Sequence, residues 1–354
     1  MRKILIDQVV DGMILANSIL SPNGKVLLKA GVELNNSYLK RLKLLGISEI
    51  YIEDDISEGI NVLDVVSEET RQEAMSIIQN VMISLRNDSG FDTKQVHDIA
   101  EKLISELVAN RNVMVNLSDI KSLDGYTFAH SVNVCILSII LGIGMGFNMN
   151  RIKELGIGAF LHDIGKVLVP MEILCKPSQL VPEEFEVVKK HANYGFEILK
   201  KCDNISTISA IVAFGHHERL DGSGYPLKLR GESIHQFTRI VSVADVYDAM
   251  TSNRAYRKKL QPHEALEYLT ALSNTQFDSA VVAAFKKHVA IYPVGSGVML
   301  NNRQKGIVVK NNQNLPTRPV VRIIYNEYNQ KLNDFYEIDL SERLNLFIIG
   351  ICQL

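Results

Sequence analysis

The chain has little net charge, few cysteines and no export signal that we can recognise. Its 354 residues carry a formal net charge of -2 with a pI near 6.5, so it lacks the basic field needed to grip a nucleic-acid polymer. The four cysteines show no CxxC spacing, which excludes a zinc knuckle or a dense disulfide framework. The N-terminus lacks the apolar core and cleavage site of a secretory signal. We expect a cytoplasmic protein with reduced thiols.

Long hydrophobic runs are also scarce. Only residues 132–149 approach the length and apolarity of a membrane span, and Asn133, Ser138 and three glycines interrupt them. This stretch begins two residues after His130, a candidate for chemistry. A helix buried behind a functional site explains the pattern better than a bilayer span, so we expect no membrane insertion.

The character of the sequence changes along the chain. Residues 1–58 combine strand-like runs at 25–28 and 47–52 with an amphipathic helix at 37–45, which is typical of a small β or α/β regulatory domain. Residues 59–119 carry two apolar stripes at helical spacing and predict a helical connector, for which a homodimer contact and packing within the chain are both open. Residues 120–291 have helical periodicity, and strand-like runs return in residues 292–354. We therefore predict a multi-domain fold, with a central all-α domain, a small N-terminal domain and a C-terminal β extension.

The central segment gathers histidines and aspartates. His162 and Asp163 adjoin in an apolar stretch, and Lys166 follows within about one helical turn. For any one such residue, a hydrogen-bonded core histidine or a helix-capping aspartate is the simpler interpretation. Burying so many ionisable groups without a metal or mutual pairing costs several kcal/mol each, so we predict a metal site. Its expected ligands are His130, His162, Asp163, His191, His216, His217 and Asp245.

Imidazoles together with carboxylates suit iron, manganese or zinc, whereas calcium prefers oxygen ligands alone. Two ions about 3.5–4 Å apart need a bridging ligand, and the two oxygens of a carboxylate serve that purpose. We expect Asp163 to be the bridge, with His130, His162 and Asp245 completing one shell and the remaining three histidines surrounding the other ion. Such a centre supplies hydroxide at neutral pH for in-line opening of a phosphodiester, which makes Asp163 catalytic.

Cations and hydrogen-bond donors near these ligands are expected to bind the phosphate. Lys166, Arg254 and Arg257 lie close to the ligands in sequence, and we assign them to the substrate, with a catalytic role for Lys166 as well. Tyr225 follows two glycines of a tight loop, where a phenol can hydrogen-bond a phosphate or stack near a base. Asp248 shares a helix face with Asp245 and is expected to orient a ligand or to bind a substrate group.

Five motifs in this order resemble those of the HD-GYP domain, a branch of the HD metal-dependent phosphohydrolases. They are TFAHS (127–131), HDIGK (162–166), HANYG (191–195), HHERLDGSGYP (216–226) and ADVYDAMTS (244–252). The resemblance covers about residues 115–290 and implies an all-helical phosphodiesterase that hydrolyses cyclic di-GMP to linear pGpG or to GMP. It also implies the same seven metal ligands, and Lys166, Tyr225, Arg254 and Arg257 at the substrate.

Two positions depart from the family pattern. Members with three metals carry a glutamate where this chain has Tyr126, so we expect two divalent ions, iron or manganese, and no organic cofactor. The family usually has Arg-Pro-Tyr where this chain has Arg254-Ala255-Tyr256. An alternative function is a signalling or protein-interaction module that binds cyclic di-GMP with little turnover, for which GGDEF-domain proteins are possible partners. A third hypothesis is hydrolysis of another nucleotide, such as a hybrid cyclic dinucleotide.

Overall fold

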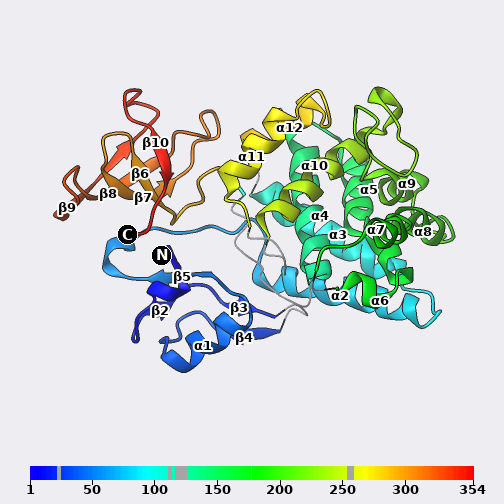
Figure 1. Cartoon of the computed structure of the whole chain (residues 1–354), viewed down its shortest axis with the longest axis horizontal. Helices are drawn as coiled ribbons and strands as arrows, with labels where there is room; N and C mark the ends of the chain where they lie inside the picture. The colour runs from blue at the N-terminus through cyan, green and yellow to red at the C-terminus, as the bar shows by residue number, and fades with distance from the viewer. Residues whose placement is uncertain (22–24, 111–113, 116–125, 177, 253–258) are drawn as a thin grey trace.

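The computed structural model describes the chain except for residues 22–24, 111–113, 116–125, 177 and 253–258. The described residues form three hydrophobic cores, one each in the N-terminal part, the helical middle and the C-terminal sheet. Figure 1 shows the helical part on the right, the two strand-rich parts on the left, and both chain ends between the latter two. The predicted fold class is confirmed, and the exact domain boundaries stay a prediction.

The N-terminal part is a small α/β unit. A three-stranded antiparallel sheet has the order β1-β5-β2, and β3 and β4 pair separately. The side chain of Asn35 caps α1 by accepting a hydrogen bond from the backbone N–H of Tyr38 (3.0 Å), and α1 packs Leu39 and Leu42 into this core. The elements are β1 (Arg2–Leu5), β2 (Ile14–Leu15), β3 (Ile19–Leu20), β4 (Val26–Leu28), α1 (Asn36–Leu44) and β5 (Glu49–Glu53), with 3-10 turns η1 (Ile6–Gln8) and η2 (Asp55–Ser57).

The helical part places the predicted site on several helices. Its elements are α2 (Glu68–Arg86), α3 (Thr93–Ala109), α4 (Tyr126–Gly144), α5 (Met149–Phe160), η3 (Ile164–Leu168), α6 (Met171–Leu174), α7 (Pro182–Lys189), α8 (His191–Leu199), α9 (Thr207–Gly215), η4 (Gly231–Ser233), α10 (Gln236–Thr251), α11 (Pro262–Ala271) and α12 (Ser279–His288). The apolar stripes of α2 and α3 belong to the same core as α4 and α5. Packing within the chain therefore accounts for the burial of the predicted connector.

The most apolar stretch of the sequence forms the centre of this core. Every residue of α4 from Val132 to Leu141 is buried, and α2, α3, α5, α10 and α12 pack around the helix. Within the described parts of the chain, no helix combines the length and apolarity that a membrane crossing requires. The interpretation as a buried helix is confirmed for the first part of this stretch, whereas α4 ends at Gly144 and residues 146, 148 and 149 are exposed.

The C-terminal part is one antiparallel sheet with strand order β10-β6-β7-β8-β9. Its strands are β6 (Gly297–Leu300), β7 (Lys305–Lys310), β8 (Val320–Tyr325), β9 (Lys331–Asp339) and β10 (Ile348–Ile351). Val298, Ile307 and Val321 are fully buried in its core, together with Ile56 and Ile60 from the N-terminal part. The first and last parts of the chain therefore share a core.

Polar contacts also join the three parts. The amino group of Met1 donates to the carbonyl of Ile60 (2.6 Å), and Arg2 donates to the carbonyl of Leu354 (3.1 Å). Glu49 on β5 forms ion pairs with Lys3 (3.1 Å) and with Lys259 of the helical part. Because all three side chains of this triad are at most 14% exposed, the N-terminal part is fixed against the segment that leads into α11.

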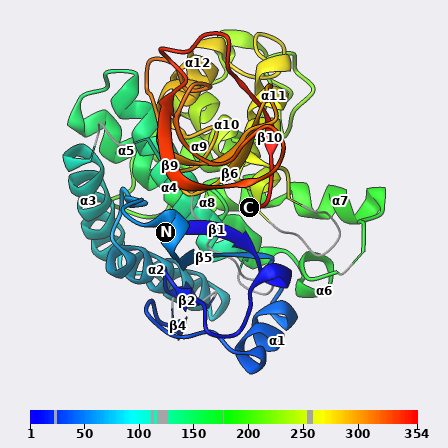
Figure 2. The same ribbon diagram turned by 90° about the vertical axis from the view of Figure 1, so that its left-hand side faces the viewer.

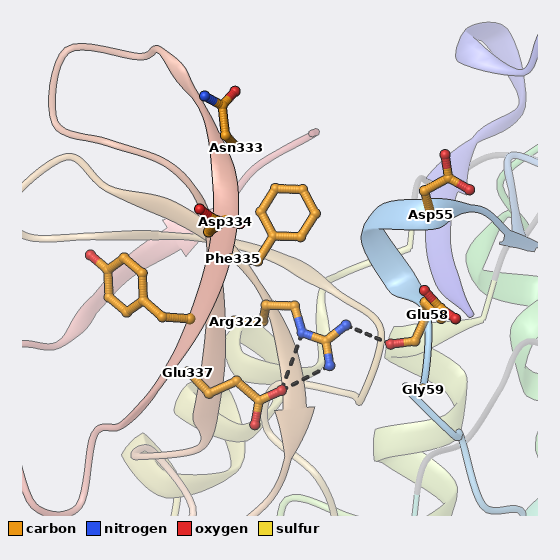
Figure 3. A pocket seen from close by; sticks show the side chains of 9 residues that line it. Asp55, Glu58, Gly59, Arg322, Asn333, Asp334, Phe335 and Glu337 are labelled. Atoms are coloured by element: carbon orange, nitrogen blue, oxygen red, sulfur yellow. Dashed lines mark hydrogen bonds and ion pairs between the residues drawn. The ribbon is translucent and has the colours of Figure 1, made fainter.

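Figure 3 shows a cleft of about 530 Å³ between η2 and β9. Arg322 crosses it, donating to Glu337 through Nε (3.1 Å) and Nη2 (2.8 Å) and to the carbonyl of Glu58 through Nη1 (2.6 Å). None of the predicted site residues lines this cleft. The arginine therefore joins the first and last parts of the chain, away from the chemistry predicted from the sequence.

Candidate metal centre

The structure brings the seven predicted ligands together from distant points of the chain. They lie on α4, on the turn between α5 and η3, at the start of α8, directly after α9, and on α10 (Figure 1). Their ligand atoms form two groups, within each of which all atoms lie within 4.8 Å of one another. One group is Asp163, His191, His216 and His217, and the other is His130, His162 and Asp245.

A glycine contact sets the position of the central aspartate. A Cβ atom on Gly165 would lie 2.0 Å from the carbonyl oxygen of His191 and 2.4 Å from the backbone nitrogen of Gly195. Only glycine allows the η3 backbone to approach α8 this closely. The close packing at Gly165 therefore brings Asp163 near His191, the first residue of α8.

Asp163 belongs to the first group, also approaches His162 of the second, and is 1% exposed. Its Oδ2 atom is 3.4 Å from Nε2 of His162, and its Oδ1 atom is 3.5 Å from Nε2 of His191 and 3.7 Å from Nε2 of His216. Oδ1 accepts no hydrogen bond from any described residue. A buried carboxylate oxygen without a donor is unfavourable unless a cation occupies the space before it.

The imidazoles present lone pairs to the same space. The Nδ1 atoms of His162, His191 and His216 lie 2.7, 2.7 and 3.0 Å from backbone carbonyl oxygens, which fixes the tautomer with the proton on Nδ1. The Nε2 atoms of His191 and His216 then face each other at 3.3 Å.

The protonation states strengthen this argument. Burial is the main reason why the pKa of His191 is lowered to about 3; Asp163 opposes this effect and Lys166 adds to it. Burial likewise lowers the pKa of His216. Near neutral pH neither ring carries a second proton, so two lone pairs oppose each other unless a cation lies between them. Burial raises the pKa of the Asp163 carboxyl, but Lys166 and His162 outweigh this effect and hold the pKa well below its usual value.

His130 is held from behind by a carboxylate. Its Nδ1 atom lies 2.7 Å from Oδ2 of Asp248, and Oδ1 of Asp248 accepts a hydrogen bond from Asn133 (2.8 Å). Because residues three apart share a helix face, His130 and Asn133 on α4 face Asp245 and Asp248 on α10. Asp248 is 2% exposed, so its position suits orienting a ligand, one of the two roles expected from the sequence, rather than contact with substrate.

The spacing of the donor atoms fits divalent metal ions. Two atoms bound to one ion at about 2.1 Å lie roughly 3.0–3.4 Å apart. The distance from Nε2 of His130 is 3.3 Å to Nε2 of His162 and 3.1 Å to Oδ1 of Asp245. Burial lowers the pKa of His130, but hydrogen bonds to Asp245 and Asp248 raise it to about 9, so a proton can take the place of a cation here. The cluster can therefore hold metal ions.

Two predicted substrate residues lie at the edge of the cluster. The ammonium group of Lys166 is 2.5 Å from Oδ2 of Asp163, and the side chain is 24% exposed. The ring of Tyr225 stacks on His217 with centroids 4.6 Å apart. Burial and the nearby Asp245 and Asp163 raise the pKa of Tyr225, so its phenol stays protonated and can donate a hydrogen bond.

The loop that carries Tyr225 is fixed by a residue to which the sequence analysis gave no role. Glu218 is 2% exposed and accepts hydrogen bonds from the backbone N–H groups of Leu227 (2.7 Å) and Leu229 (3.0 Å). A Cβ on Gly224 would lie 2.4 Å from the carbonyl oxygen of His217, so this position requires glycine. The sequence feature that could have identified Glu218 is its position directly after the histidine doublet. Asn133, also overlooked, follows His130 by three residues.

Two other predictions depend on residues that the structure does not describe. Arg254 and Arg257, expected to bind the phosphate, lie outside the described residues, as does Ala255. The side chain of Tyr126, on which the expected number of ions depends, is likewise not described.

Comparison with known proteins identifies two families along the chain. Residues 127–281 match the family described as "HD domain", and residues 297–354 match the "KOW domain associated with HD domain". Among curated proteins, the chain is 35% identical over 252 residues to a cyclic di-GMP phosphodiesterase of Pseudomonas aeruginosa, covering 71% of this chain and 61% of that protein. It is 36% identical over 168 residues to 3'3'-cGAMP-specific phosphodiesterase 3 of Vibrio cholerae, covering 48% of this chain and 36% of that protein.

Among solved structures, an HDG"Y"P protein from Bdellovibrio bacteriovorus, Bd1817, aligns with a TM-score of 0.50 and 19% identity, covering 80% of this chain and 97% of that one. At this identity the likeness concerns the fold. The chain spans less than two thirds of the length of either curated relative described above.

Proposed function

The central domain of this chain is an HD domain of the HD-GYP family, and from that premise we propose that the protein is a metal-dependent phosphodiesterase that hydrolyses cyclic di-GMP to linear pGpG or GMP. The observation that carries the proposal is Asp163, whose two oxygens face two separate histidine groups with Oδ1 lacking a donor. The name of the Pseudomonas aeruginosa relative, a cyclic di-GMP phosphodiesterase, supports the choice of substrate.

We propose two divalent ions as cofactors, iron or manganese, held by the seven residues of the cluster. A pair of such ions, when bound, lowers the pKa of water to give a hydroxide nucleophile and polarises the phosphoryl oxygen. Nitrogen and carboxylate donors in this ratio suit these metals better than magnesium or calcium.

The side chains of the protein prepare the site for a phosphodiester. Asp248 fixes the ring of His130 so that Nε2 points into the cluster. Lys166 is partly exposed beside Asp163 and can extend its ammonium group to a phosphate oxygen. Tyr225, held against His217, can donate its phenolic proton to another phosphate oxygen. Substrate is thereby bound where the two groups of ligands meet.

The experiment is turnover by purified protein loaded with iron or manganese, using cyclic di-GMP, 3'3'-cGAMP and cyclic di-AMP as substrates and resolving the products by chromatography. We expect cyclic di-GMP to be cleaved and His162→Ala to abolish cleavage. Preferential cleavage of 3'3'-cGAMP, the substrate in the name of the Vibrio cholerae relative, would reassign the substrate. Tight binding of cyclic di-GMP without product would favour the signalling module instead. The GGDEF-domain partner and the homodimer stay predictions.

A further inference from the structure

Helix α7 (Pro182–Lys189) buries none of its eight residues, although it ends two residues before His191 of the metal cluster. Local interactions hold it together, since Glu184 accepts a hydrogen bond from the backbone N–H of Val181 (3.0 Å) and pairs with Lys176 (2.7 Å). Figure 2 shows α7 projecting from the side of the helical part together with α6. Core packing therefore does not explain why this helix is present.

One side of α7 carries an exposed aromatic ring beside the site. Phe185 is 44% exposed, whereas Phe160, Phe237 and Phe285 of the same domain are at most 1% exposed. Its ring stands edge-on to that of Tyr225, with centroids 6.2 Å apart at 84°. Because Tyr225 in turn stacks on a predicted metal ligand, the exposed ring lies one aromatic residue away from the metal centre.

A cation accompanies this ring. The ammonium group of Lys189 lies 4.8 Å from the centroid of Phe185 and 5.5 Å from that of Tyr225. The side chain is 28% exposed and pairs with Glu186 (2.6 Å) on the surface. An exposed aromatic face beside a cation is the combination with which proteins bind nucleobases, through stacking and hydrogen bonds to the base edge. Guanine offers two acceptors on that edge, O6 and N7, to which lysine commonly donates.

We propose that Phe185 and Lys189 form a guanine-binding platform at the rim of the metal centre. The base takes the face of Phe185 over which the ammonium group lies, and the partly exposed Lys189 side chain turns to donate to the O6 and N7 edge of the base. The inference rests on the proposed function for the identity of the substrate. It adds Phe185 and Lys189 to the substrate-binding residues and assigns to them the specificity for guanine. Adenine places an amino donor where guanine has O6, so Lys189 favours guanine at this position.

The kinetic test compares wild type with Phe185→Ala, Phe185→Tyr and Phe347→Ala. Phe347 is the matched control, since it is 48% exposed and lies in the C-terminal part. We expect Phe185→Ala to raise KM for cyclic di-GMP about tenfold with kcat nearly unchanged, and Phe185→Tyr to restore most of the loss. Inhibition by inorganic phosphate, which has no base, should not change. Lys189→Met should reduce the preference for cyclic di-GMP over cyclic di-AMP about tenfold.

Calorimetric binding of GMP to metal-loaded protein separates this inference from the proposed function, because it requires no turnover. Weaker binding of GMP to Phe185→Ala, with phosphate binding intact, supports the platform even if the wild type cleaves no cyclic di-GMP. Affinity for GMP within twofold of wild type, equal losses for Phe347→Ala, or no binding of GMP to the wild type would each overturn it.

Discussion

Replacing Asp163 by asparagine changes the centre while keeping its shape. The two oxygens of Asp163 lie 3.4 Å from His162 of one group and 3.5 Å from His191 of the other. Asp245 also reaches both groups, with Oδ1 3.1 Å from His130 and Oδ2 3.7 Å from His217, but Asp163 is the more deeply buried of the two carboxylates. An amide offers one oxygen as a ligand and an NH2 group that donates but cannot bind a cation, so it can serve only one of the two ions. We expect the bound metal to fall from two ions to about one, and turnover to fall at least ~10³-fold, equivalent to about 4 kcal/mol of transition-state stabilisation.

The assay is metal content by elemental analysis together with kcat on cyclic di-GMP, both at fixed protein concentration. Asp203→Asn is the matched control, since Asp203 is an exposed carboxylate of the same domain and should change neither quantity. If Asp163→Asn kept two ions and more than a tenth of wild-type turnover, the reasoning that assigns the bridge to this residue would be wrong.

Three further predictions concern the support of the cluster. Asp248→Asn should weaken metal affinity about 10- to 100-fold, measured by metal titration, because it removes the charge that orients His130. Gly165→Ala should destabilise the domain by about 3 kcal/mol, a fall in Tm of roughly 6–12 °C, since its Cβ would overlap the backbone of His191. Metal binding at pH 7.5 should release a proton from His130, whose pKa of about 9 follows from the two carboxylates that outweigh its burial. Apparent affinity should therefore rise up to about tenfold per pH unit towards pH 9, whereas the metal-free protein loses the stability from this proton between about pH 6.5 and 9.

Each of these predictions has a result that would contradict it, and the glycine variant also has a matched control. For Asp248→Asn, unchanged metal affinity would show that the hydrogen bond to His130 has no orienting role. Gly90→Ala is the control for Gly165, since no atom lies within 4 Å of the added Cβ, and equal Tm values for both variants would contradict the clash argument. For proton release, calorimetry in buffers of different ionisation enthalpy counts the protons released when metal binds. We expect more protons at pH 7.5 than at pH 9.5, and equal numbers would show that His130 is already neutral at pH 7.5.

Much of the candidate site could be predicted from the sequence because its residues are chemically unusual for a helical core. Burying five imidazoles and two carboxylates requires pairing or a metal, whatever the details of the fold. The apolar stretch of α4 could likewise be assigned to the core, because Asn133 and Ser138 interrupt its apolar character and His130 lies just before it. Composition and spacing alone were sufficient for these conclusions.

Other features depend on contacts that spacing does not encode. Asp248 could be placed on the same helix face as Asp245, but only the packing of α10 on α4 shows that His130 and Asn133 occupy both of its oxygens. The role of Glu218 depends on two backbone N–H groups nine and eleven residues later. Phe185 stands between Glu184 and Glu186 in a segment that carries no motif, and only the structure shows that its ring is exposed beside Tyr225.

The most direct test of the central claim is anomalous X-ray diffraction from crystals of the protein loaded with manganese or iron. We predict two peaks about 3.5–4 Å apart on either side of Asp163, one among His130, His162 and Asp245 and the other among His191, His216 and His217. A single peak that does not contact Asp163, or peaks outside this cluster, would contradict the account.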